Sequence, residues 1–199
     1  QVATRASDET LSQAFVPWFF RVVPDDRQQA DRLLREMAYQ AHHKLVVIHA
    51  DAYDHRMAAG TFSKKARADG LELPEVRPYD TATGLTPEIT DLPAGTDAVV
   101  IFDHFQSGRR ILDKIVQEHP DVQIYGSMSM TMDGYIGKEV SEGCEGGIFV
   151  SSRYCFTTPG QAFKSAFKEL YDQMPDPAAS YTFDGINLII HAVREAGTD

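Results

Sequence analysis

No apolar run in the sequence approaches the roughly 20 residues that a helix needs to cross a membrane, and there are only two cysteines and one tryptophan in 199 residues. Basic charge is not in excess either: 19 lysines and arginines stand against 29 aspartates and glutamates, a net charge of -10. This balance argues against nucleic acid as a partner and against a polyanionic ligand. The chain starts at Gln1 without a basic and apolar leader, as expected of a mature product or an excised fragment.

The cysteine pattern predicts free thiols. Cys144 and Cys155 flank residues 146–152, which have the composition of a strand. An extended segment rises about 3.3 Å per residue, so it would hold the two cysteines too far apart for a disulfide. Buried cysteines commonly behave as small core residues.

The common catalytic and cofactor motifs are also missing. There is no Gly-x-Ser-x-Gly elbow, no Walker loop and no Gly-x-Gly-x-x-Gly turn. Neither cysteine has an obvious histidine partner, and the glycines at 143, 146 and 147 precede a strand rather than follow one. We therefore expect no enzyme activity and no cofactor.

What the sequence does have is a regular alternation of strand and helix. The apolar fraction of 43% and charged fraction of 24% are ordinary globular values, and the length favours a single domain over residues 1–199. Continuous apolar runs suit parallel strands that are covered on both faces. We predict an α/β fold, a mostly parallel, doubly wound sheet with helices on both faces. Predicted strands are 45–48, near 76, 98–102, 122–125 and 147–150; predicted helices are 26–41, 54–69, 107–118, 162–171 and 181–193, with a short turn at 87–92.

Polar side chains follow three of the predicted strands. In an open α/β sheet, ligands bind outside the carboxyl ends of the strands. This rule selects candidates without reference to any family. They are His49, Asp51, Tyr53, Asp54 and His55 after the first strong strand, Asp103, His104 and Phe105 after the second, and Gly126, Ser127, Met128 and Ser129 after the third.

Three interpretations of these residues stay open: a solvated rim of the sheet, a hydrogen-bonding site for an organic ligand, and a metal site. Imidazoles and carboxylates suit zinc or similar ions. The spacing of His49, Asp51, His55, Asp103 and His104 matches no standard zinc motif, however, so the sequence predicts no stoichiometric metal.

Residues 18–26 (Trp-Phe-Phe-Arg-Val-Val-Pro-Asp-Asp) resemble the signature that opens the second lobe of type 1 periplasmic solute-binding proteins. This family includes branched-chain amino-acid-binding proteins and the ligand-binding ectodomains of natriuretic-peptide and metabotropic receptors. Other segments are similar to the family's motifs in the same order. They are 1–11, 46–54, where Asp54 replaces a usual glycine, 69–71, 97–101, 142–150 and 181–187.

The resemblance implies one half of a clamshell: residues 1–17 lead in from a missing first lobe, and 18–199 form the second lobe. It implies a binding lobe for a small polar solute, amino-acid-like or related, in the periplasm or outside the cell. Its partners would be the first lobe and a membrane permease or a receptor signalling domain. The expected ligand-binding residues are Tyr53, Asp103, His104, Phe105, Ser127, Asp51 and Met128.

One departure from the family's pattern concerns charge. Met128 stands near the position where amino-acid-binding members place a carboxylate for the ligand's ammonium group, and the resemblance leaves Asp103 as the neighbouring carboxylate. The alternatives to an ABC-importer binding protein are the ectodomain of a receptor or kinase and a small α/β enzyme that uses the Asp/His rim.

Overall fold

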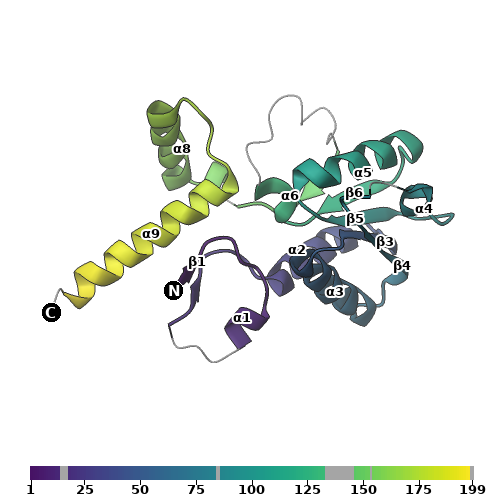
Figure 1. Ribbon diagram of the computed structural model, residues 1–199, viewed down its shortest axis with the longest axis horizontal. Coiled ribbons are helices and arrows are strands. Elements are labelled where there is room, and N and C mark those ends of the chain that lie inside the picture. Colours follow the sequence, from purple (N-terminus) through teal and green to yellow (C-terminus); the bar gives the residue numbers. More distant parts are fainter. Residues whose placement is uncertain (14–17, 84–85, 133–145, 153, 198–199) are drawn as a thin grey trace. The chain divides into compact units, whose positions relative to one another are not determined.

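The computed structural model describes residues 1–13, 18–83, 86–132, 146–152 and 154–197 (Figure 1). Internal contacts group the chain into two compact units: Gln1–Asp25 with Ser151–Asp199 as unit 1, and Asp26–Val150 as unit 2. The sequence predicts one domain over 1–199, whereas the internal contacts group the chain into two units. Where the second lobe begins and ends stays a prediction. Cys144 lies outside the described residues, so the prediction of free thiols does too.

Unit 2 is built on a five-stranded sheet in which every pair of neighbouring strands is parallel. The strand order is β4-β3-β5-β6-β7. This confirms the predicted α/β fold with a parallel sheet. The strands are β3 (Lys44–Ala50), β4 (Glu72–Tyr79), β5 (Ala98–Phe102), β6 (Gln123–Gly126) and β7 (Ile148–Phe149).

Helices cover both faces of this sheet. Alternate residues of a strand point to opposite faces, so each central strand contributes to two cores. Leu45 and Val47 of β3 pack into a core with α2 (Asp26–Tyr39) and α3 (Tyr53–Ala68). Val46 and Ile48 pack into a second core with α5 (Phe105–Glu118). All four of these strand residues are fully buried, which explains why the strand is a continuous apolar run. Two short helices, α4 (Pro87–Thr90) and α6 (Ser129–Met132), complete the described part of the unit.

Unit 1 contains a two-stranded parallel sheet and two long helices. Its elements are β1 (Val2–Ala3), α1 (Thr10–Gln13), β2 (Phe20–Arg21), the 3-10 turn η1 (Tyr154–Phe156), α8 (Thr158–Tyr171) and α9 (Pro177–Ala196). Both long helices begin at a side-chain cap: Thr157 accepts a hydrogen bond from the Gly160 N–H, and Asp176 accepts one from Ala179. The predicted helices 162–171 and 181–193 are confirmed, and both begin earlier than their apolar patterns do.

The two long helices expose much of their apolar surface. Among the described residues of α9, only Pro177, Ser180 and Gly185 are buried, and in α8 only Gly160 is. Exposed apolar side chains are Leu170, Tyr171, Phe183, Ile186, Leu188, Ile189, Ile190 and Val193. None of the described helices is long and apolar enough to cross a membrane.

Two helical glycines should respond in opposite ways to the same substitution. A Cβ at Gly160 would overlap the carbonyl oxygen of Tyr154, so we expect Gly160→Ala to destabilise the chain by about 2 kcal/mol. Gly60 lies on the exposed side of α3 with nothing near its Cβ position, so Gly60→Ala should stabilise by about 0.5–1 kcal/mol. Thermal unfolding followed by circular dichroism measures both changes, and equal effects of the two substitutions would contradict this account.

Candidate ligand-binding site

The chain reverses its direction across the sheet between β3 and β5. From β3 it passes through α3 to β4 on one side, and from β5 it passes through α5 to β6 on the other. Helices α3 and α5 cover opposite faces, as the two cores show. We call the region outside the carboxyl ends of β3 and β5 the crevice, because open α/β sheets bind ligands at such a switch point.

The first turns of α3 and α5 line this crevice. Neither helix has a side-chain cap: the N-cap positions are Ala52 and His104, and neither side chain bonds the first turn. The first backbone N–H groups of a helix lack intrahelical partners and carry a partial positive charge. The crevice thus combines two uncapped helix N-termini with the side chains of those first turns.

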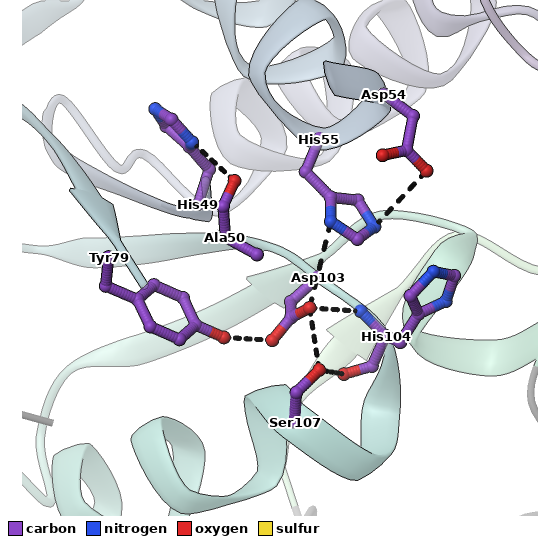
Figure 2. A network of polar contacts seen from close by, with 8 residues as sticks. All are labelled: His49, Ala50, Asp54, His55, Tyr79, Asp103, His104 and Ser107. Carbon is purple, nitrogen blue, oxygen red and sulfur yellow. Dashed lines mark hydrogen bonds and ion pairs between the residues drawn. The ribbon is translucent and has the colours of Figure 1, made fainter. Parts of the chain in front are cut away.

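At its floor lies Asp103, which is 1% exposed. The Tyr79 hydroxyl, at the end of β4, donates a short hydrogen bond to this carboxyl group. The Ser107 hydroxyl (2.8 Å) and the backbone N–H of His104 (2.7 Å) donate to its other oxygen (Figure 2). Burial, and then the bond to Asp103, raise the pKa of the Tyr79 hydroxyl well above its usual range. Asp103 therefore ties the end of β4 to the start of α5.

His55 packs above Asp103, with a side chain that is only 4% exposed. Its Nδ1 lies 3.8 Å from Asp103 Oδ1 and its Nε2 lies 3.8 Å from Asp54 Oδ2, both beyond hydrogen-bond length. Neither ring nitrogen has a hydrogen-bond partner among the described residues. Burial lowers the pKa of the His55 imidazole against the nearby carboxylates of Asp54 and Asp103, so its neutral form is favoured at pH 7.

His104 completes this group from the other helix. Its ring meets that of His55 edge-on, with the ring centroids 4.7 Å apart (Figure 2). His55 lies in the first turn of α3 and His104 is the residue before α5, so the contact joins the two sides of the crevice.

Comparisons with known proteins decide the family. A family model described as periplasmic binding protein matches residues 2–199. The chain belongs to the periplasmic binding protein family. Its structural neighbours are type 1 periplasmic binding proteins, the family that the sequence resembles. No curated protein matches the chain significantly.

Three solved structures illustrate the likeness. An ABC-transporter solute-binding protein from Rhodopseudomonas palustris BisB5, in complex with 3,4-dihydroxybenzoic acid, has a TM-score of 0.81 at 19% identity over 100% of this chain. Another from R. palustris, in complex with benzoate, has a TM-score of 0.82 at 18% identity over 100% of this chain. A leucine-binding protein from Thermotoga maritima MSB8 has a TM-score of 0.80 at 16% identity over 98% of this chain.

At these identities the likeness shows the type 1 periplasmic-binding-protein fold alone. The chain spans 56% of the length of the first two structures and 57% of the third. The family and these neighbours are solute-binding proteins.

Of the residues predicted to bind ligand in this periplasmic binding protein, some reach the surface of the crevice. Tyr53 begins α3 and is 59% exposed, and Asp51 is exposed beside Arg56, with 3.0 Å between carboxylate oxygen and guanidinium nitrogen. His104 and Phe105 are partly exposed. That these exposed side chains contact a solute stays a prediction.

The other predicted ligand-binding residues are buried. Asp103 is occupied by the hydrogen bonds described above, and Ser127 and Met128 are each 2% exposed. The Met128 N–H donates to Gln29 Oε1 at 3.0 Å, which joins the end of β6 to α2. All three follow the carboxyl ends of their strands, as the strand-end rule predicts. Their contact with a solute stays a prediction.

Sequence reasoning left out residues that hold the site together. His55 was among the strand-end candidates but not in the predicted ligand set, and Tyr79 and Ser107 were not candidates at all. Tyr79 ends a strand that has little apolar character, so the sequence does not mark it as a strand-end residue. Its hydrogen bond to Asp103 becomes visible only once β4 is paired with β3. Ser107 lies four residues after Asp103, about one helical turn, and this spacing could have indicated that the two side chains meet.

Proposed function

We propose that this chain is the second-lobe part of a substrate-binding protein that delivers a small solute to an ABC importer, in the periplasm or outside the cell. One observation carries the proposal: in a member of this family, two uncapped helix N-termini and an exposed Tyr53 converge on the crevice at the carboxyl ends of β3 and β5. That arrangement suits a small molecule with a negative group and an apolar or aromatic body.

The solute that fits this crevice best is a small carboxylic acid. Uncapped N-termini attract carboxylates through their N–H groups and the helix dipole. Asp103 is buried and already accepts three internal hydrogen bonds, so it is a poor partner for a ligand ammonium group. Two of the solved relatives carry an aromatic acid as their ligand, 3,4-dihydroxybenzoic acid in one and benzoate in the other.

The exposed apolar faces of α8 and α9 support the presence of a first lobe. Side chains such as Ile186, Ile189 and Val193 are 49–53% exposed along one helix, more apolar surface than a stable soluble unit usually leaves open. The chain also spans little more than half of its solved relatives. We propose that first-lobe polypeptide outside this chain covers these faces, and that a membrane permease receives the solute.

The proposal is tested by screening acids against the full-length protein by thermal shift. The panel contains leucine, benzoate and 3,4-dihydroxybenzoic acid, and solute recovered after incubation is analysed by mass spectrometry. We expect at least one acid to raise the melting temperature and to be recovered unchanged. Conversion of the bound acid to a product would support an α/β enzyme instead, and a panel with no shift would contradict the solute class.

Replacing Tyr53 with alanine should weaken binding of the selected acid about tenfold, because an exposed aromatic ring contributes contact area at little entropic cost. Calorimetry on the full-length protein measures the change. Tyr39→Ala is the matched control: Tyr39 is 83% exposed at the end of α2, near the amino ends of the strands, and should leave affinity unchanged. Equal effects of the two substitutions would remove Tyr53 from the site.

A further inference from the structure

We propose that Asp54, His55 and His104 bind one divalent transition-metal ion, with Zn²⁺ as the probe. Within the described residues, these three side chains each offer a ligand atom, and the atoms lie within 4.8 Å of one another. Two imidazoles and a carboxylate form the donor set that zinc and its neighbours prefer, and three protein ligands leave a position open.

The state of His55 points to an ion rather than to a chance cluster. Its side chain is 4% exposed, and neither ring nitrogen makes a hydrogen bond within the described residues. A buried polar group without a hydrogen bond destabilises the folded state. A metal ion on Nε2 would satisfy that nitrogen, since Nε2 faces Asp54.

Binding requires the three ligand atoms, which lie within 4.8 Å of one another, to move closer together. Two ligands bound at about 2.0–2.1 Å with a tetrahedral angle lie about 3.3 Å apart, and His55 Nε2 is now 3.8 Å from Asp54 Oδ2. Asp54 is exposed and His104 is partly exposed, so both side chains have room to move. His55 is held by burial and serves as the fixed member of the set.

Asp103 supplies a feature that metal-bound histidines commonly have. The nitrogen that does not bind metal usually faces a carboxylate or carbonyl, which orients the ring. Here Nδ1 of His55 faces Asp103 Oδ1 at 3.8 Å, and Asp103 is held in place by Tyr79 and Ser107 (Figure 2). Asp103 is a positioning residue in this scheme, and Tyr79 and Ser107 act through it.

The sequence predicts no metal because the spacing of these residues matches no linear motif. The fold shows how they meet without one: Asp54 and His55 come from the first turn of α3, and His104 comes from the junction of β5 and α5. Metal binding depends on the placement of donor atoms rather than on their order in the chain. The proposal concerns the ion alone and does not depend on the identity of the solute.

The experiment is calorimetric titration of the chelator-treated, dialysed chain with Zn²⁺, accompanied by visible absorption spectra with Co²⁺. We expect one equivalent of Zn²⁺ and the intense visible bands of a tetrahedral Co²⁺ site. His104→Ala and Asp54→Asn should each weaken Zn²⁺ binding about tenfold or more. Both positions reach solvent, so these variants should fold, and circular dichroism checks that they do.

His43→Ala is the matched control, because His43 is an exposed histidine near the amino ends of the strands. It should bind Zn²⁺ like the unsubstituted chain. The proposal is overturned if the chain takes up no Zn²⁺, or if His104→Ala and Asp54→Asn bind it as the unsubstituted chain does. Loss of the ion in His43→Ala with retention in the other two would place it at the surface and would equally overturn the site.

Discussion

Replacing Asp103 with alanine should lower the free energy of unfolding by about 3 kcal/mol. The carboxyl group is 1% exposed and accepts hydrogen bonds from the Tyr79 hydroxyl, the Ser107 hydroxyl and the His104 N–H. Ser107 has a second acceptor in the His104 carbonyl, at 3.3 Å, but the substitution strands the buried Tyr79 hydroxyl. A buried donor without an acceptor accounts for much of the expected loss. Urea unfolding measures it.

The double-mutant cycle with Tyr79→Phe shows whether the hydrogen bond is responsible. Tyr79→Phe alone should destabilise by about 1 kcal/mol, because the ring stays and only the hydroxyl leaves. The pair of substitutions should then lower stability by less than the sum of the two, because no hydroxyl remains to be stranded. Additive losses, or a loss below about 1 kcal/mol for Asp103→Ala, would show that Asp103 does not anchor β4 to α5.

The parallel sheet was predictable because its central strands are buried on both faces. Residues 45–48 and 98–102 are apolar without interruption, and each is fully or almost fully buried between two helical layers. Helix α2 was predictable for the related reason that one stripe of its surface, including Leu33 and Met37, faces the core. In both situations a single physical requirement, burial, determines the pattern of residues.

Strand β4 shows where this reasoning loses its signal. It is eight residues long, yet the sequence indicated only a weak strand near Val76. Among the described strands, β4 lies at the edge of the sheet and pairs with β3 alone. An edge strand tolerates charged residues and proline, here Arg77 and Pro78, because one side of it has no neighbour to bond. Its composition therefore resembles that of a loop.

The site was predictable as a place but not as a set of contacts. The strand-end rule located the crevice, and it named His55, Asp103 and His104 among many polar residues. Which of them are buried, and which contact one another, depends on how α3 and α5 pack at the ends of the strands. Met128 is an example: it follows a strand end, yet its side chain is only 2% exposed. The spacing of residues along the chain carries no information about this packing.

The proposed half-clamshell implies that the 199-residue chain binds a solute at least about 100-fold more weakly than a two-lobed protein containing it, a difference of about 2.7 kcal/mol. Lobe closure encloses a ligand and brings contacts to it from both sides. In this chain the crevice residues Tyr53, His104 and Phe105 remain partly or largely in contact with solvent, so they do not enclose a ligand. Affinity depends on how much of the ligand is enclosed and on how well the site is organised beforehand.

Calorimetry with the same acid on both proteins measures this difference. Circular dichroism first establishes that the shorter chain is folded, so that weak binding reports a missing lobe and not an unfolded one. Tyr53→Ala in the full-length protein provides the second control: it should lower affinity by much less than removal of the first lobe, because it deletes one contact while closure remains. Equal affinity of the two unsubstituted proteins would show that this chain is a complete binding module. In that event the half-clamshell interpretation would fail, and the solute would be held entirely by the crevice between the first turns of α3 and α5.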